Sequence, residues 1–223
     1  MMKCWFLDLD DTIYEASGGM LREIHLRMDA FIARELRMSV QEAHALRAHY
    51  WATYGSTFIA LWRLHRIDPV RFLTETHDFD PTPYIHYRGD VVADISHIEG
   101  RRVVFTNGPG TYAQRVVAAL GIASVVDVVV SCFEMRLFGD WRPKPSVSML
   151  LAQARRQGMH PARCALVDDS LMNLKAAKCA GFKTIWATGY RLAHGRLTHR
   201  RSSPYVDHQI RHIHELGSRK FYD

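Results

Sequence analysis

The stretch CWFLDLDDT, residues 4–12, decides the fold of this chain. Its first four residues are apolar, and such a short run predicts a parallel strand buried on both faces. Asp8, Asp10 and Asp11 follow at the end of the strand where open α/β sheets place their ligand sites. Carboxylates this close repel one another unless a cation or hydrogen bonds offset the repulsion. The stretch therefore predicts a functional site or, alternatively, a solvated acidic turn that caps the strand.

Three further segments argue against the solvated turn. Residues 103–108 (VVFTNG) are a second apolar strand, which ends in a hydroxyl, an amide and a glycine. Residues 142–145 (RPKP) hold a lysine between two prolines, whose fixed φ angles make its backbone rigid. Residues 164–170 (CALVDDS) are again an apolar strand that ends in paired carboxylates, and Asn173 follows one helical turn later. Each segment is weak by itself, but together they predict an active site at the ends of parallel strands.

In this order, the residues resemble the haloacid dehalogenase superfamily of phosphohydrolases. The positions that match its four motifs are Asp8, Asp10 and Thr12, then Thr106, then Lys144, then Asp168 and Asp169 with Asn173. The resemblance implies an α/β fold in which a Rossmann-like parallel-sheet core carries an inserted α-helical cap domain. It spans most of the chain, and Thr12 and Asn173 are expected to hold the site's loops in place.

The remaining core sequence agrees with such a sheet. Strands and helices alternate after the second strand, which predicts right-handed crossovers between parallel strands. The expected helices are 112–120, 146–157 and 171–179, and the expected strands are 125–130, 183–186 and an edge strand at 206–210 before a short C-terminal helix. We expect the core domain to comprise residues 1–13 and 97–223.

Residues 14–96, between the first two strands, have helical character and are expected to form the cap. Apolar residues recur on one helical face over 21–38, and Ser39 with Glu42 is a capping-box signature for the next helix. A third helix is expected at 58–65, and Asp68 before a proline predicts a fourth. A freestanding bundle is the alternative, but both ends return to the catalytic strands, so the bundle should sit above the site.

Composition restricts the class of protein. The chain has 223 residues and a net charge of +6, which fits either nucleic acid or a phosphorylated small molecule as partner. No nucleic-acid motif accompanies the basic stretch 191–203, so we expect no nucleic-acid binding. No apolar run approaches the roughly 20 residues that span a bilayer, and the first strand leaves no room for a signal peptide. The four cysteines lack metal-ligand spacing, and we expect a cytoplasmic monomer or homodimer that does not bind membranes.

The residue types predict phosphate-ester hydrolysis. Asp8 is the expected nucleophile, which forms an aspartyl-phosphate and divides one difficult displacement into two. Asp10 is the expected acid and base, because it can protonate the leaving oxygen and then take a proton from water. Thr106 and Asn107 are expected to donate hydrogen bonds to phosphoryl oxygens, and Lys144 to neutralise the charge that builds up there.

A divalent cation is expected beside the nucleophile. Its expected ligands are Asp8, Asp169 and the backbone carbonyl of Asp10, and Asp168 is expected to bind it through water. An all-oxygen set favours Mg²⁺ over Zn²⁺. Dehalogenases of the superfamily lack the second aspartate because a departing halide needs no proton, so Asp10 favours phosphate esters. A phosphomutase and a catalytically idle binding or regulatory protein remain alternatives.

The cap resembles that of the pyrimidine 5′-nucleotidase group of the superfamily. Residues 50–57 (YWATYGST) and 65–69 (HRIDP) carry the resemblance, and residues 76–80 (THDFD) depart from it. The resemblance implies a pyrimidine nucleoside 5′-monophosphate as substrate, with Tyr54 stacking on its base. Small sugar phosphates are the alternative substrates. The alternative role for Tyr54, Thr57 and His77 is packing between cap and core.

Overall fold

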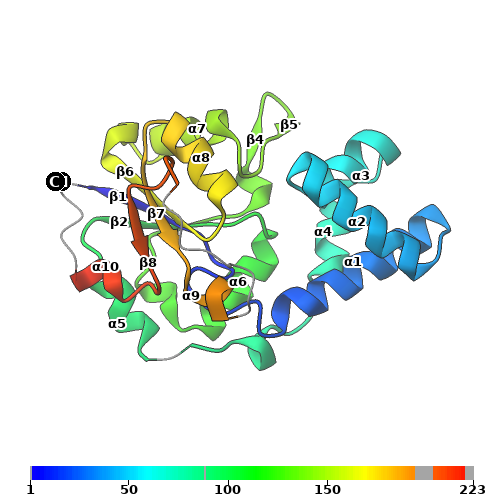
Figure 1. Cartoon of the computed structure of the whole chain (residues 1–223), viewed down its shortest axis with the longest axis horizontal. Helices are drawn as coiled ribbons and strands as arrows, with labels where there is room; N and C mark the ends of the chain where they lie inside the picture. The colour runs from blue at the N-terminus through cyan, green and yellow to red at the C-terminus, as the bar shows by residue number, and fades with distance from the viewer. Residues whose placement is uncertain (1, 88, 194–202, 219–223) are drawn as a thin grey trace.

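The structure is a computed structural model that describes residues 2–87, 89–193 and 203–218 (Figure 1). In this part of the chain, six strands pair in parallel into one sheet with the order β3-β2-β1-β6-β7-β8. The expected Rossmann-like α/β fold is confirmed. The strands are β1 Cys4–Leu7, β2 Arg101–Phe105, β3 Val128–Val130, β6 Cys164–Asp168, β7 Lys183–Ala187 and β8 His208–Ile210.

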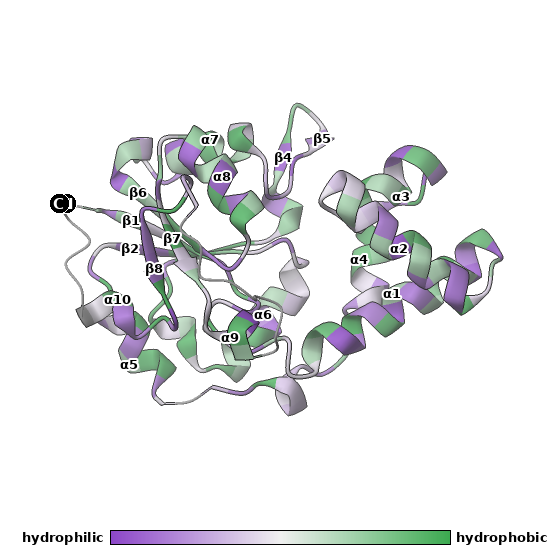
Figure 2. Ribbon diagram, in the orientation of Figure 1, coloured by the Kyte–Doolittle hydropathy of each residue, from purple (hydrophilic) through white to green (hydrophobic). Residues whose placement is uncertain are grey.

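Strand β1 lies inside the sheet because its residues are apolar on both faces. It pairs with β2 on one side and with β6 on the other, and all four of its residues are buried. Trp5 and Leu7 contribute to one hydrophobic cluster, whereas Cys4 and Phe6 contribute to the other. Figure 2 shows the strands at the middle of the sheet in the colours of hydrophobic residues. Two separate hydrophobic clusters therefore hold the strand that leads into Asp8.

Helices cover both faces of the sheet (Figure 1). Helices α5 and α6 contribute to the cluster that contains Trp5, and α7 and α8 contribute to the cluster that contains Phe6. The core helices are α5 Val91–Ser96, α6 Gly110–Ala119, α7 Val147–Arg156, α8 Leu171–Cys179, α9 Gly189–Ala193 and α10 Glu215–Ser218. Among the described residues, no helix combines the length and the apolar character that crossing a bilayer requires.

Some core elements differ from expectation at their ends. Strand β3 is shorter than the expected 125–130, because a 3₁₀ turn at Ile122–Ser124 continues into a bond from the Val125 N–H to the Ile122 carbonyl. Helix α9 was not expected and takes up the first residues of the basic stretch 191–203. Residues 194–202 of that stretch lie outside the described residues.

Four helices pack together as the smaller lobe: α1 Met20–Leu36, α2 Val40–Tyr54, α3 Thr57–His65 and α4 Pro69–Thr76. The capping box at Ser39 and the Asp68 cap are both present, as expected. Helix α2 continues past the expected end at residue 50 and stops where Gly55 takes a positive φ of 70°. Phe31, Phe58 and Phe72 are buried in a hydrophobic cluster inside this lobe.

A hairpin of the core touches this helical lobe. Its strands are β4 Arg136–Leu137 and β5 Asp140–Trp141, and Trp141 packs edge-on against Phe58 with ring centroids 5.7 Å apart. Helix α5, in the segment that leads from the four cap helices back to β2, contacts α10 of the core. The four helices thus lie within the proposed cap range of 14–96, and the last helix of that range packs on the core.

Candidate functional site

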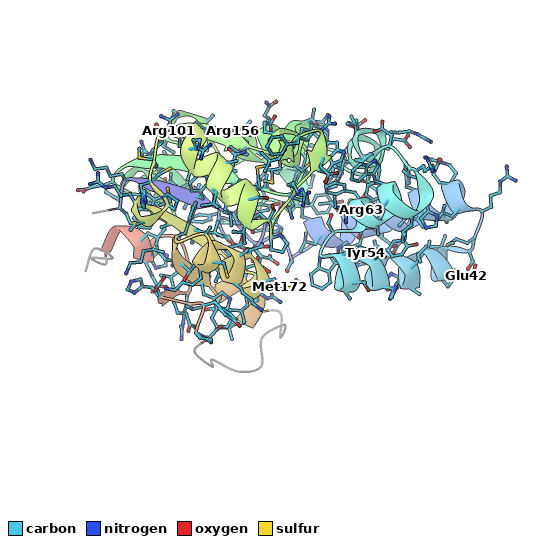
Figure 3. All side chains as sticks on the ribbon, turned by 90° about the horizontal axis from the view of Figure 1, so that it is seen from above. Glu42, Tyr54, Arg63, Arg101, Arg156 and Met172 are labelled. Atoms are coloured by element: carbon cyan, nitrogen blue, oxygen red, sulfur yellow. The ribbon has the colours of Figure 1, made fainter. Side chains whose placement is uncertain are left out.

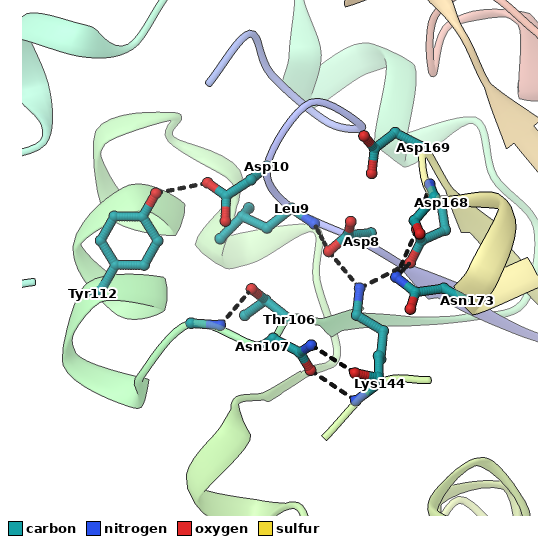
Figure 4. A network of polar contacts seen from close by, with 12 residues as sticks. Asp8, Leu9, Asp10, Thr106, Asn107, Tyr112, Lys144, Asp168, Asp169 and Asn173 are labelled. Atoms are coloured by element: carbon teal, nitrogen blue, oxygen red, sulfur yellow. Dashed lines mark hydrogen bonds and ion pairs between the residues drawn. The ribbon is translucent and has the colours of Figure 1, made fainter. Parts of the chain in front are cut away.

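Asp8 is the first residue after β1 and lies between the ends of β2 and β6 (Figure 4). The residue is 7% exposed, and its Oδ1 accepts a hydrogen bond of 2.8 Å from the Leu9 N–H. Burial raises the pKa of Asp8 well above its usual range, and the neighbouring carboxylates of Asp168 and Asp169 add to the rise, whereas Lys144 opposes it.

Lys144 bridges two carboxylates. Its Nζ lies 2.6 Å from Asp8 Oδ1 and 2.9 Å from Asp168 Oδ2, and its side chain is 3% exposed. Burial by itself would lower the pKa of Lys144, but the two carboxylates outweigh burial and raise it. The lysine therefore stays charged, and the Asp8 oxygen is held in one orientation.

Asp168 is fully buried at the end of β6 and is held by several donors. Its Oδ1 accepts from the Ser170 N–H at 2.8 Å and from Asn173 Nδ2 at 2.9 Å, and its Oδ2 accepts from Lys144. Asn173 therefore holds Asp168 in place, as expected of a loop-positioning residue. Because both oxygens already accept hydrogen bonds, Asp168 is better placed to orient its neighbours than to bind a cation directly.

Asp8, Asp168 and Asp169 bring one oxygen each within 4.8 Å of the others. Burial, together with the neighbouring carboxylate of Asp168, raises the pKa of Asp169 to about 7, although Arg191 opposes the shift. Three carboxylates against the one ammonium of Lys144 leave the cluster with an excess of negative charge when all are ionised. Carboxylate oxygens are the ligands that Mg²⁺ prefers, so these residues fit a divalent cation.

Asp10 points away from this cluster, toward Tyr112 (Figure 4). The hydroxyls of Tyr14 and Tyr112 each donate to Asp10 Oδ1 at 2.6 Å, and the two hydroxyl oxygens lie 2.8 Å apart. Burial raises the pKa of Asp10, although the two donated hydrogen bonds lower it. The side chain of Asp10 is therefore engaged by tyrosines, and the expected metal ligand at this position is its backbone carbonyl.

Thr106 and Asn107 follow β2, as expected, but they have partners within the protein. Thr106 Oγ1 accepts from the Gly108 N–H at 3.0 Å. The Asn107 side chain donates to the Lys144 carbonyl at 2.9 Å and accepts from the Lys144 N–H at 2.8 Å. Sequence reasoning missed this second role of Asn107, because its partner lies 37 positions away. Thr12 is buried, and among the described residues its hydroxyl has no hydrogen-bond partner.

A cavity of about 630 Å³ lies between the lobes and reaches the carboxylates and the lysine of the candidate site. Its lining includes Asp8, Asp10, Thr106, Asn107, Lys144 and Asp169 from the core and His25, Arg47 and Trp51 from the cap. A second cavity of about 380 Å³ shares Trp51 and Lys144 and is lined further by Leu171 and Met172. Figure 3 shows Tyr54 on the cap side and Met172 on the core side of the space between the lobes.

The sequence analysis singled out Tyr54, Thr57 and His77 in the cap. A side chain that stacks on a ligand has to line a cavity. Among the described residues, Trp51 lines both cavities and Tyr54 lines neither. The Tyr54 ring packs edge-on against Tyr50, with ring centroids 6.1 Å apart. Thr57 is buried at the start of α3, and His77 is buried with its ring edge-on to that of Tyr112. The His77 contact fits packing between cap and core, whereas the Tyr54 contact lies within α2.

Arg191, from the unexpected helix α9, is a site residue that sequence reasoning missed. Its Nη1 lies 3.3 Å from Asp169 Oδ2 and donates to the Asp169 carbonyl at 3.2 Å. It lines both cavities. The only sequence signal was its place at the start of the basic stretch, which does not distinguish it from the other arginines there.

A model of the haloacid dehalogenase-like hydrolase family matches residues 2–181. The chain belongs to this family of hydrolases. It is 24% identical over 190 residues to Phosphate metabolism protein 8 of Saccharomyces cerevisiae, and the match covers 80% of this chain and 59% of that protein. The chain thus matches about three fifths of the length of this curated relative.

Solved structures of two kinds of enzyme share the fold. CbbY from Rhodobacter sphaeroides in complex with phosphate has a TM-score of 0.67 at 19% identity, over 97% of each chain. L-2-haloacid dehalogenase from Xanthobacter autotrophicus, with chloropropionic acid covalently bound, has a TM-score of 0.59 at 16% identity, over 98% of each chain. A HAD phosphatase from Thermococcus onnurineus has a TM-score of 0.64 at 18% identity, over 97% of each chain, so the fold alone does not distinguish a phosphatase from a dehalogenase.

Proposed function

We propose that the protein is a Mg²⁺-dependent phosphomonoester hydrolase that acts through an aspartyl-phosphate. The observation that carries this proposal is the buried Asp8, held by Lys144 beside the acidic pair Asp168 and Asp169. A nucleophilic carboxylate with a fixed cation and an all-oxygen cation site beside it fits attack on an anionic phosphorus.

Asp10 favours a phosphate ester over a haloacid as substrate. Hydrolysis of an ester with an alkoxide leaving group needs a proton donor, whereas departure of a halide does not. Asp10 lines the cavity, and burial raises its pKa, which favours the protonated form that an acid catalyst needs. A protonated carboxyl group beside the cavity is not needed in dehalogenation, because the departing halide takes no proton.

The side chains divide the reaction between them. Asp8 Oδ attacks phosphorus while Asp10 gives its proton to the leaving oxygen, and Lys144 offsets charge on the phosphoryl group. Asp10 then takes a proton from the water that hydrolyses the aspartyl-phosphate. Asp8, Asp169 and the Asp10 carbonyl would hold Mg²⁺, which supplies positive charge and orients the phosphoryl oxygens.

The proposed substrate is a pyrimidine nucleoside 5′-monophosphate. Trp51 is 63% exposed and lines both cavities, so it takes the stacking role that was expected of Tyr54. The smaller cavity is also lined by Leu171 and Met172 of the core, which add apolar surface for a flat ring. A single-ring base fits a bounded space of this kind better than a two-ring base.

The test compares kcat/KM for UMP, CMP, AMP and a small sugar phosphate with Mg²⁺ present. Trp51→Ala should lower kcat/KM for UMP about tenfold, since stacking on an aromatic ring contributes ~1–3 kcal/mol per base. Tyr54→Ala is the matched control and should change it little. If AMP equals or exceeds both pyrimidine nucleotides, the nucleotide assignment falls and only the phosphatase chemistry remains. If the sugar phosphate is preferred, a metabolite phosphatase or a phosphomutase replaces the nucleotidase assignment. If no phosphomonoester is hydrolysed, a catalytically idle binding protein is favoured.

A further inference from the structure

The two tyrosine hydroxyls beside Asp10 form a cluster with one carboxylate oxygen. Both contact Oδ1 at 2.6 Å. The two tyrosines come from different parts of the chain, since Tyr14 follows β1 and Tyr112 is on α6. Tyr14 is fully buried, and Tyr112 is 1% exposed.

A carboxylate oxygen has two lone pairs. The hydroxyls of Tyr14 and Tyr112 both contact Asp10 Oδ1 and also contact each other, so they enclose this oxygen. The proton that Asp10 exchanges with a substrate or with water is therefore expected on the other oxygen, Oδ2, to which neither tyrosine donates. Figure 4 shows one oxygen of Asp10 directed at Tyr112 and the other turned away from that ring.

We propose that Tyr14 and Tyr112 are positioning residues that anchor Oδ1 of Asp10 and thereby make Oδ2 the oxygen that moves the catalytic proton. This inference rests on the proposed phosphatase function. In the first half-reaction, an Asp8 carboxylate oxygen bonds to phosphorus as the bond from phosphorus to the bridging ester oxygen breaks, and the Oδ2–H bond of Asp10 breaks as its proton passes to that ester oxygen. In the second, Oδ2 accepts a proton from water as the water oxygen bonds to phosphorus and the Asp8–phosphorus bond breaks.

Tyr112 is also held from the cap side. Its ring meets the His77 ring edge-on at 5.2 Å and the Phe79 ring at 6.5 Å, both in the segment that leads from α4 back to the core. One helical turn after Tyr112, Arg115 binds Asp78 at 3.0 Å. Helix α6 therefore contacts both Asp10 and the cap segment that contains His77, Asp78 and Phe79. The position of Asp10 Oδ1 thus depends on both lobes.

The test uses two substrates of similar shape, phenyl phosphate and p-nitrophenyl phosphate. Phenolate is the poorer leaving group, so its departure depends more on the proton from Asp10. Tyr112→Phe and Tyr14→Phe should each lower kcat for phenyl phosphate about tenfold with KM little changed, and should affect p-nitrophenyl phosphate much less. Asp10→Asn should show the same pattern with a larger loss, and the double tyrosine variant should approach it.

Tyr87→Phe is the matched control, because Tyr87 also donates a 2.6 Å hydrogen bond to an aspartate, Asp94, outside the cavity. Tyr87→Phe should leave kcat for both substrates unchanged while lowering the melting temperature about as much as Tyr112→Phe and Tyr14→Phe do. Equal losses on the two substrates in Tyr112→Phe, or no loss, would overturn the positioning role.

If the wild-type protein hydrolyses no phosphomonoester, the proposed function fails, and crystal structures of the wild type and the double variant decide the positioning role separately. The role predicts one Asp10 orientation in the wild type and a turned or divided carboxyl group in the variant. An unchanged Asp10 in the variant would refute it.

Discussion

The side chain of Asn107 closes a ring of two hydrogen bonds with the backbone of Lys144. Asn107 Nδ2 donates to the Lys144 carbonyl at 2.9 Å, and its Oδ1 accepts from the Lys144 N–H at 2.8 Å. The loop after β2 thereby fixes the backbone from which the lysine reaches Asp8 and Asp168. The position of the Lys144 ammonium thus depends on the Asn107 side chain, which the sequence analysis expected to bind phosphate.

Asn107→Ala should reduce both activity and stability. Loss of two hydrogen bonds should lower the free energy of unfolding by about 1–3 kcal/mol and let Lys144 move away from the phosphoryl group. Urea unfolding and kcat for p-nitrophenyl phosphate measure the two effects. Asn107→Asp keeps the acceptor for the Lys144 N–H and should lose less stability. A fall in kcat with unchanged unfolding would show that binding phosphate is the main task of Asn107.

Asp8→Asn should abolish turnover without unfolding the protein. A neutral amide cannot attack phosphorus, so kcat should fall by ~10⁴ or more. Stability should be equal or higher, because burial and two neighbouring carboxylates make the charged form of Asp8 unfavourable in the fold. The measurements are phosphate release and thermal unfolding of both proteins. Substantial turnover in a folded Asp8→Asn protein would remove Asp8 from the nucleophile role.

Chelation should stop hydrolysis, and Mg²⁺ should restore it. Asp169→Asn should weaken Mg²⁺ about tenfold or more by removing one of the carboxylates that converge beside Asp8. Metal titration by calorimetry measures the affinity independently of activity. Asp140→Asn, on the hairpin, removes an equal charge outside the cavities and serves as the control. Full activity after exhaustive EDTA treatment would contradict a metal-dependent site.

His77 should make the fold sensitive to acid. Burial lowers its pKa from 6.5 to about 4, so the unfolded chain binds a proton between these values that the folded protein does not bind. The contribution of His77 is fully present above pH 6.5 and falls as pH decreases toward 4, by at most about 3 kcal/mol. Urea unfolding at pH 7 and pH 5 should show a smaller decrease for His77→Gln than for the wild type. An equal decrease in the two proteins would show that His77 binds protons equally in the folded and the unfolded state.

Much of the fold followed from local sequence. The run at residues 4–7 is apolar at every position, which only an inner strand of a sheet covered on both faces satisfies, and β1 is such a strand. Ser39 and Asp68 begin helices because their side chains bind backbone N–H groups two or three residues ahead. These signals act within a few residues, so they are readable without the tertiary structure.

The tertiary structure alone decided which side chains meet. Tyr112 reaches Asp10 across 102 positions, and Arg191 reaches Asp169 from a helix that the sequence did not predict. Trp51, and not Tyr54, faces the cavities, because the rotation of α2 is set by packing against its neighbouring helices. The sequence by itself indicated the sheet, the helical insertion and the carboxylates of the candidate site, since each follows from a pattern within a few consecutive residues. The anchors of those carboxylates and the surface offered to a leaving group depend on how distant helices pack, and local pattern carries no information on that.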